Sequence, residues 1–276
     1  MGSVTDCPVG ALDSTSTAQP TFAVVIPAFN EAPTLRDIVT RALREVDRVI
    51  VVDDGSDDGT DTALQGLPVT VLRNPANLGK SGSLRRGMVH ALMEGASAVI
   101  TLDADGQHEP EDIPRLIAAH LRDPQSIIVG ARVRGKERQP RARYLANRFG
   151  DFLLSWAADY PITDSQSGFR LYPETLLAAI DIHNDHSKYF VFESAVLIDA
   201  ARAGIRTVSV EISAIYHSGV RTSHFRPVVD FLIIGRMITW KLLIRGFNIP
   251  GFVRAWRSPN RANPSHPSRV AGDRIR

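Results

Sequence analysis

The amino-acid sequence predicts an α/β fold with a mixed, mainly parallel sheet that is flanked by helices. Two observations carry this prediction. Short apolar runs alternate along the chain with segments of helical periodicity, and this alternation is typical of a parallel sheet. Polar segments rich in acids and amides directly follow three of the apolar runs, which is where an open parallel sheet binds its ligands.

The composition fits a globular protein with one large domain and extensions. The chain has 276 residues, of which 43% are hydrophobic. Its net charge of +2 is too small to suggest a nucleic-acid partner. The single cysteine, Cys7, excludes a disulfide framework and a cysteine-based metal site, and no signal-peptide pattern opens the sequence. These observations predict a cytoplasmic protein.

The first half of the chain contains the elements on which the fold prediction rests. Residues 1–20 are rich in Ser, Thr, Gly and Pro without periodicity, and we expect them to form a disordered arm. The strands of the sheet are expected at residues 22–26, 48–52, 69–72, 98–102 and 127–129. The helices between them are expected at residues 34–44, 81–93 and 113–120.

Beyond residue 130 the pattern becomes less regular. Residues 132–148 are strongly basic and are expected to begin irregularly, before a helix at about 144–157. The further elements expected are a loop and strand within 163–172, a helix at 192–203 and a strand at 207–212. Residues 258–276 show no apolar period, and we expect them to form a disordered tail.

Asp103 and Asp105 follow an apolar strand directly. Side chains two residues apart on an extended backbone point the same way, and two carboxylates held together repel unless a cation lies between them. Oxygen ligands suit Mg²⁺ or Mn²⁺, and Gln107 offers a further oxygen. His108 is expected to face solvent. The alternative interpretation is an acidic turn without a chemical role.

A second acidic segment, Asp53-Asp54-Gly55-Ser56, also comes directly after a buried strand. A carboxylate at this edge of the sheet can accept hydrogen bonds from a nucleobase or from ribose hydroxyls. The alternative is that these acids cap the helix that follows, because Asp and Ser are frequent at helix N-termini.

The segment 77–82 contains glycines and Lys80, as phosphate-binding loops do. The full phosphate-loop pattern is absent, because Asn74 stands where the pattern needs a glycine, and this excludes an ATPase of that type. Gly79 and Gly82 still permit close approach of the backbone to a ligand, and Lys80 is placed to bind a diphosphate. The alternative is an ordinary loop and helix start.

Four segments together point to a family. They are Pro27-Ala28-Phe29-Asn30-Glu31, Asp53-Asp54-Gly55-Ser56, Asn77-Leu78-Gly79-Lys80 and Asp103-Ala104-Asp105-Gly106-Gln107. In order and spacing they resemble the inverting family 2 glycosyltransferases of the GT-A (Rossmann-like) fold. The resemblance covers about residues 22 to 226 and predicts a catalytic domain at 21–226. It is greatest to the polyprenyl-phosphate glycosyltransferases, including the dolichyl-phosphate mannose synthases.

This resemblance implies an activity and a set of donor-binding residues. The activity is transfer of a hexose from a nucleotide diphosphate sugar, UDP- or GDP-linked, to a polyprenyl phosphate. Asp54 would recognise the base, and Lys80 would contact the diphosphate. Pro27, Phe29, Asn30 and Glu31 would hold the nucleotide, while Asp103, Asp105 and Gln107 would bind Mg²⁺ or Mn²⁺ together with the donor diphosphate.

The resemblance also implies an acceptor site built from basic residues. A phosphate acceptor is already ionised, so it needs cationic donors instead of a general base, and Arg suits bidentate phosphate contact. Arg132 occupies the place of the arginine in the Gly-Ser-Arg of the lipid-phosphate enzymes, with Ala131 in place of the serine. Arg143 and Asn147 have the spacing of an Arg and a Ser that hold the acceptor phosphate there. Asp164 and Glu193 match acidic positions near the sugar. Asp164 is placed to orient either the sugar or the basic cluster, and the alternative for Glu193 is a position on a helix surface. Arg221 lies in a segment that resembles the loop closing on the donor.

Residues 227–257 are expected to form amphipathic helices, the first of which starts at Pro227. The stretch 228–249 is apolar but contains four charged residues: Asp230, Arg236, Lys241 and Arg245. Each charge at the centre of a spanning helix costs about 2.5–3.5 kcal/mol, which argues against a spanning helix. We expect peripheral attachment at the cytoplasmic face of a membrane, with Trp240 and Phe247 as aromatic anchors. The alternative is a helix packed on the catalytic domain or in a dimer.

Two other functions compete with the leading prediction. One is a family 2 glycosyltransferase that acts on a saccharide or another small acceptor, which would need a general base. The other is a non-catalytic scaffold that binds nucleotide sugar at a membrane. The oligomeric state is not predicted by the sequence.

Overall fold

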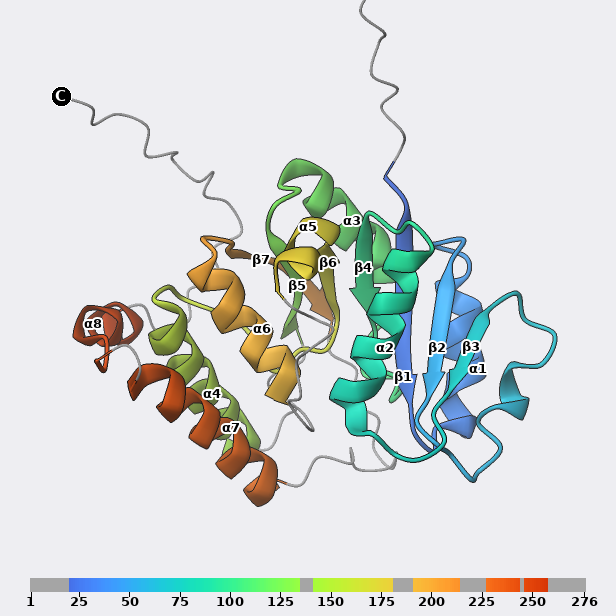
Figure 1. Cartoon of the computed structure of the whole chain (residues 1–276), viewed down its shortest axis with the longest axis horizontal. Coiled ribbons are helices and arrows are strands. Elements are labelled where there is room, and N and C mark those ends of the chain that lie inside the picture. Colours follow the sequence, from blue (N-terminus) through green and yellow to red (C-terminus); the bar gives the residue numbers. More distant parts are fainter. Residues whose placement is uncertain (1–19, 135–140, 181–190, 214–226, 244–245, 258–276) are drawn as a thin grey trace, which may run out of the picture.

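The computed structural model describes residues 20–134, 141–180, 191–213, 227–243 and 246–257. At its centre lies a seven-stranded sheet with the order β3-β2-β1-β4-β6-β5-β7 (Figure 1). The strands are β1 (Phe22–Ala28), β2 (Val49–Asp53), β3 (Thr70–Arg73), β4 (Ala98–Thr101), β5 (Ile127–Arg134), β6 (Arg170–Pro173) and β7 (Thr207–Ser213). Among the described strands β6 alone is antiparallel to its neighbours. The predicted mixed, mainly parallel sheet is therefore confirmed.

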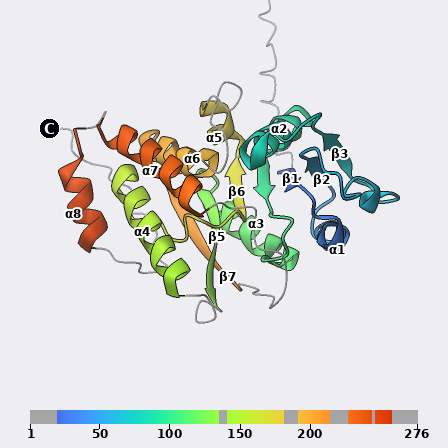
Figure 2. The same ribbon diagram turned by 90° about the horizontal axis from the view of Figure 1, so that it is seen from below.

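Helices cover both faces of this sheet. They are α1 (Ala32–Ala42), α2 (Gly79–Met93), α3 (Ile113–Arg122), α4 (Arg141–Ala158), α5 (Glu174–Ala179), α6 (Val191–Arg202), α7 (Pro227–Leu243) and α8 (Ile249–Arg257), with short 3-10 turns at Thr62–Leu64 and Pro110–Asp112. Figure 2 shows α1 and α2 on opposite sides of the strands.

Apolar side chains of the strands alternate between two cores. On β1, Ala23 and Val25 belong to the core that includes residues of α2, whereas Val24 and Ile26 belong to the core that includes residues of α1 and α3. Because both faces are covered, the strand is apolar along most of its length instead of alternating with polar residues. This explains why continuous apolar runs marked the strands in the sequence.

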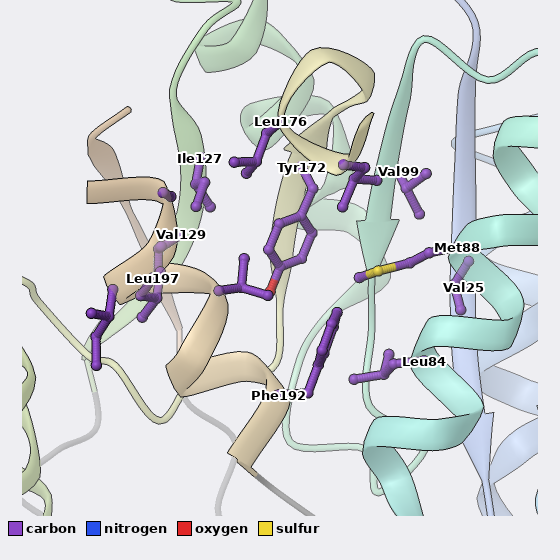
Figure 3. Packing of buried hydrophobic residues seen from close by; sticks show 14 of the residues in the cluster. Val25, Leu84, Met88, Val99, Ile127, Val129, Tyr172, Leu176, Phe192 and Leu197 are labelled. Carbon is purple, nitrogen blue, oxygen red and sulfur yellow. The ribbon is translucent and has the colours of Figure 1, made fainter. Parts of the chain in front are cut away.

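Helix α2 approaches the sheet closely at Gly87. A Cβ atom at this position would lie 3.0 Å from Val52 Cγ2, so only glycine allows the observed spacing. Leu84 and Met88 of the same helix are buried in the core that Phe192 of α6 completes (Figure 3). This packing fixes the position of α2 against β1 and β2.

The C-terminal helices pack on other helices beside the sheet. Helix α7 contacts α4 and α6, and α8 contacts α4 (Figure 2). Ile238 and Leu242 of α7 are buried in the core, and Lys241 Nζ lies 2.5 Å from Asp199 Oδ1 of α6. The described part of α7 thus packs on the rest of the domain, the alternative that the sequence left open. Within the described residues, no helix combines the length and the apolar character needed to cross a bilayer.

Several element boundaries differ from those predicted. Strand β5 continues to Arg134, so Arg132 lies in a strand and not in an irregular segment. Helix α4 begins at Arg141, earlier than expected, and the short helix α5 was not predicted. The direction of β6 also escaped prediction, because side chains alternate between the faces in parallel and antiparallel strands alike. Residues 1–19 and 258–276, where an arm and a tail are expected, lie outside the described residues.

Candidate active site

Three loops at the carboxyl ends of β1, β2 and β4 are joined by hydrogen bonds. The Asn30 N–H in the loop after β1 donates to Ser56 Oγ in the loop after β2, at 2.9 Å. Thr34 Oγ1 at the start of α1 donates to the Ala104 carbonyl in the loop after β4, at 2.8 Å. The three polar segments therefore share one rim of the sheet, as their places after the strands predicted.

The turn between β1 and α1 is fixed by the loop after β2. Asn30 has a φ of +57°, in the left-handed region that Asn tolerates better than most residues, and its Oδ1 accepts from the Asp57 N–H at 3.0 Å. The Glu31 N–H donates to Thr60 Oγ1 at 3.1 Å. The residues predicted to hold the nucleotide, Pro27, Phe29, Asn30 and Glu31, are all partly buried at this turn.

The buried Asp54 carboxylate supports the segment that leads into α2. Its Oδ1 accepts from Asn74 Nδ2 at 2.7 Å and from the Leu78 N–H at 2.9 Å, and its Oδ2 accepts from the Gly79 N–H at 2.8 Å. These bonds hold the start of α2, and with it Lys80, against the rim. Base recognition by Asp54 stays a prediction, and the contacts seen here are all with the protein's own loop.

Lys80 joins the rim to α6. Its Nζ lies 2.6 Å from Asp103 Oδ1 and 3.1 Å from Glu193 Oε2. Burial acts to lower the pKa of Lys80, but the carboxylates of Asp103 and Glu193 outweigh it and raise that pKa above its ordinary value. The sequence left open whether Glu193 lies on a helix surface, and the structure buries it against Lys80.

The two carboxylates predicted to bind metal have opposite pKa shifts. Burial acts to raise the pKa of Asp103, but the Lys80 ammonium outweighs it and the pKa lies below its ordinary value. Burial and then the charge of Asp103 raise the pKa of Asp105. Asp105 is thus the carboxylate that lacks a close cation among the contacts that the described residues make, and a divalent ion beside it would stabilise its charged form.

Gln107 and His108 follow these acids and behave differently from the predictions. Gln107 Nε2 donates to Asp105 Oδ2 at 2.8 Å, so its amide holds the carboxylate, and its role as a metal ligand stays a prediction. The expectation that His108 faces solvent is wrong. His108 is buried with its ring 5.5 Å from that of Phe169, and burial together with the Arg132 charge lowers its pKa to about 4.

Arg132 and Asp164 form a buried ion pair with three hydrogen bonds. Arg132 Nε and Nη2 donate to Asp164 Oδ2 and Oδ1 at 2.9 and 2.7 Å, and the Arg132 backbone N–H donates to Oδ2 at 2.8 Å. The two residues come from β5 and from the loop before β6. Asp164 therefore orients Arg132, one of the two roles that the sequence analysis considered for an acid at this place.

Arg170 organises the loop before β6, and sequence reasoning did not single it out. The side chain is fully buried and donates to the carbonyls of Ser165, Ser167 and Glu193 at 2.7, 2.8 and 2.8 Å. A second support is Asp151 of α4, whose Oδ1 accepts from the Ser165 N–H at 2.8 Å. Nothing in the pattern of a Gly-Phe-Arg segment indicates that its arginine points inward.

The other residues predicted for the acceptor and donor sites are placed only in part. Asn147 is half-buried on α4, and the backbone of Arg143 lies on the same helix, but the Arg143 side chain is outside what the structure describes. Arg221 also lies outside the described residues. The predictions for these three residues stay predictions.

The residues at the rim fit a divalent ion that is shared with a ligand. In the described part of the chain, no three His, Cys, Asp or Glu side chains are grouped closely enough to hold a metal by themselves. Asp103 and Asp105 offer two carboxylates, and Mg²⁺ is usually bound by one or two carboxylates together with substrate phosphates and water. The donor set is thus suited to Mg²⁺ or Mn²⁺ only when a phosphate ligand completes it.

Comparison with known proteins identifies the family. A family model described as Glycosyl transferase family 2 matches residues 23–181. The chain is 34% identical over 205 residues to the undecaprenyl-phosphate mannosyltransferase of Micrococcus luteus, which covers 68% of this chain and 81% of that protein. It is 30% identical over 253 residues to the polyprenol monophosphomannose synthase of Mycolicibacterium smegmatis, which covers 83% of this chain and 94% of that protein.

The fold itself resembles a solved glycosyltransferase. Glucosyl-3-phosphoglycerate synthase from Mycobacterium tuberculosis, in complex with Mn²⁺ and uridine-diphosphate-glucose, matches with a TM-score of 0.61 and 23% identity. The match covers 82% of this chain and 79% of that chain. With the family model and the two relatives, this similarity leads to one conclusion: the chain belongs to glycosyl transferase family 2 and has the GT-A fold.

Proposed function

We propose that this chain is an inverting hexosyltransferase that uses a nucleotide diphosphate sugar and a polyprenyl phosphate, and that it depends on Mg²⁺ or Mn²⁺. The relatives from M. luteus and M. smegmatis are named for reactions of this acceptor class, which supports the proposal. The observation that carries it is a carboxylate rim beside a buried arginine. The loop before β6, which carries the Asp164 that pairs with Arg132, lies against Asp103, since a Cβ atom at Gly168 would be 2.7 Å from Asp103 Cγ, so the two halves of the site are neighbours.

The residues of each half have separate tasks. When bound, the divalent ion supplies Lewis-acid stabilisation of the charge that develops on the leaving diphosphate. Arg132, fixed by Asp164, provides a positive charge for the acceptor phosphate, with Arg143 and Asn147 of α4 as further donors. Because that phosphate is already ionised, its oxygen attacks the anomeric carbon without a general base, and in-line attack inverts the configuration.

The experiment that tests this function is a donor panel. Radiolabelled UDP- and GDP-hexoses are supplied with undecaprenyl phosphate and Mn²⁺, and a lipid-linked sugar is scored. One donor is expected to give lipid product. A product formed only on a saccharide acceptor would contradict the proposed acceptor, and nucleotide binding without any turnover would favour a non-catalytic scaffold.

Replacing Gly168 by alanine is expected to disturb the metal half of the site. A Cβ atom on Gly168 would lie 2.7 Å from Asp103 Cγ, so the carboxylate must move. Since misplacement of a reacting group by about 1 Å costs about a hundredfold in rate, we expect a loss of that order in kcat/KM and weaker Mn²⁺ binding. Both are measured by steady-state kinetics and titration with Mn²⁺.

The matched control is Gly235→Ala in α7. A Cβ atom there meets nothing within 4 Å, so activity is expected to stay at the wild-type value. Unchanged Mn²⁺ binding in Gly168→Ala would contradict the role assigned to Asp103.

Peripheral attachment to the cytoplasmic face of a membrane is the second part of the proposal. Helices α4 and α8 join through aromatic rings: the Trp156 and Phe252 centroids lie 5.1 Å apart, and the Phe152 and Trp256 centroids lie 6.3 Å apart. Apolar side chains remain exposed on both helices, namely Leu145, Phe149, Ile249, Phe252, Val253 and Trp256. Arg148, Arg254 and Arg257 accompany them. An apolar face with arginines beside it suits an anionic bilayer surface.

The variant Ile249→Ser/Trp256→Ser is expected to weaken binding to vesicles that contain an anionic lipid. The two side chains are 71% and 70% exposed and lie outside the buried core, and the Trp156–Phe252 contact between α4 and α8 remains in the variant. Deletion of 227–257 would be a poorer test, because it also removes buried Ile238 and Leu242. Co-sedimentation with the vesicles measures the change.

The control is Met93→Ser, an exposed apolar residue at the end of α2, which is 81% exposed. It is expected to bind vesicles as the wild type does. Equal binding by the double variant and the wild type would show that the α4–α8 face does not contact the membrane.

A further inference from the structure

Lys80 lies between two carboxylates that belong to different parts of the fold. Asp103 follows β4 at the rim of the sheet, and Glu193 lies in the first turn of α6. The Lys80 ammonium is 2.6 Å from Asp103 Oδ1 and 3.1 Å from Glu193 Oε2. All three side chains are largely buried, so salt screens the interactions between them only weakly.

The same Asp103 carboxylate is half of the predicted cation site. A divalent ion held by Asp103 and Asp105 would place two more positive charges close to the Lys80 ammonium. Like charges at such distances oppose each other strongly in a partly buried site. The ammonium and the ion therefore compete for Asp103.

The Glu193 carboxylate is a second ion-pair partner for the Lys80 ammonium. Its Oε1 is buried and accepts no hydrogen bond from the described part of the chain, so a second acceptor oxygen is available beside the Oε2 that Lys80 already contacts. The backbone of Glu193 is fixed, because its carbonyl accepts from Arg170 Nη1 at 2.8 Å. A rotation of the Lys80 side chain toward Glu193 keeps its charge paired and releases Asp103.

We infer that Lys80 is a positioning residue that exchanges Asp103 for Glu193 when the divalent ion binds, so that ion binding depends on the donor diphosphate. The inference rests on the proposed function. The donor diphosphate attracts both the released Lys80 ammonium and the divalent ion. The nucleotide and the divalent ion therefore bind cooperatively. Such coupling is reciprocal: the ion must raise the affinity for the nucleotide by the same factor as the nucleotide raises the affinity for the ion.

The test measures binding of Mn²⁺ alone to the full chain by electron paramagnetic resonance, and then binding in the presence of UDP or GDP. In Lys80→Met, Mn²⁺ alone is expected to bind about tenfold more tightly, since a nearby charge of this kind shifts an ionic equilibrium by at least about that factor. The gain from the nucleotide is expected to shrink. Lys80→Gln, which keeps a hydrogen-bond donor without the charge, serves if the methionine variant does not fold.

The matched control is Lys241→Met, which removes a lysine that is also paired with a carboxylate, 2.5 Å away, outside the site. It is expected to bind Mn²⁺ as the wild type does. Glu193→Gln is expected to weaken binding of Mn²⁺ alone, because Lys80 then has only Asp103, and Lys80→Met/Glu193→Gln is expected to match Lys80→Met. A merely structural role for the three residues would instead weaken Mn²⁺ binding in every variant.

Folded Lys80→Met or Lys80→Gln that binds Mn²⁺ no more tightly than the wild type would overturn the inference. Since the experiment contains no acceptor, it separates this result from failure of the proposed function. Tighter Mn²⁺ binding in these variants, with no lipid product in the donor panel, would refute the acceptor and support the exchange. Equal Mn²⁺ binding by the wild type and Asp105→Ala would refute the ion site itself, and the exchange with it.

Discussion

Asp105→Ala is expected to abolish formation of the lipid-linked sugar, with a fall in kcat of at least about a hundredfold. The Asp105 carboxylate is partly buried, and burial together with the neighbouring Asp103 raises its pKa. Without it, a divalent ion would retain one carboxylate from the rim, and the leaving diphosphate would lose most of its stabilisation. The measurement is transfer of radiolabel to undecaprenyl phosphate over a range of Mn²⁺ concentrations.

The control for this prediction is Asp47→Ala. Asp47 is an exposed acid just before β2, at the end of the strand opposite to the rim. The Asp47→Ala substitution changes the net charge by the same amount as Asp105→Ala, and it is expected to leave kcat unchanged. If Asp105→Ala retained wild-type activity at any Mn²⁺ concentration, the metal role of the rim would be refuted.

The second large effect is expected from Asp164→Asn. Asparagine has nearly the same side-chain size as aspartate and also tolerates the φ of +50° at this position. The substitution therefore removes only the charge that pairs with buried Arg132. Removing one partner of a buried pair costs about 3 kcal/mol or more. At about 2–4 °C per kcal/mol for a domain of this size, the melting temperature should fall by about 10 °C. Differential scanning calorimetry measures this change.

The function should change together with the stability. A misplaced Arg132 is expected to raise KM for the lipid phosphate more than KM for the nucleotide sugar. In Arg132→Met/Asp164→Asn, where no charge is left unpaired, much of the stability should return while lipid transfer stays low. A double variant with full activity would contradict the role of Arg132 at the acceptor.

An exposed ion pair provides the comparison for the stability effect. Asp37 and Arg41 on α1 lie 3.3 Å apart, and the Asp37 side chain is 72% exposed. Asp37→Asn is expected to change the free energy of unfolding by less than about 1 kcal/mol. Similar losses in the two asparagine variants would mean that burial does not strengthen the pair at Asp164.

The sequence predicted the shared rim of the loops after the strands better than the surroundings of Arg132, and the reason is physical. The donor segments come directly after strands, so the apolar runs that mark the strands also locate Asp54 and Asp103 at one rim. No comparable rule locates the loop before β6, because its position depends on the direction of that strand. The contact of Gly168 with Asp103 and the pairing of Lys80 with Glu193 therefore could not be predicted.

Burial of polar residues was the other weak point. His108 follows an acidic turn, and its polar character suggested exposure, yet the ring packs near Phe169. Arg170 carries a full positive charge, yet its side chain is fully buried, because backbone carbonyls accept hydrogen bonds from its guanidinium. Such burial depends on hydrogen-bond partners that the tertiary fold brings together, and the local sequence does not indicate which partners these are.

The reversed direction of β6 brings a loop of a different kind to the rim of the sheet. Because β6 is antiparallel to β4 and β5, the loop that enters it reaches the same rim that the parallel strands reach at their exits. Asp164 and Gly168 lie in that entering loop, while Asp54, Lys80 and Asp103 belong to the βα units. An insertion before β6 is therefore expected to change the rim near Arg132 without shifting the register of β1, β2 and β4.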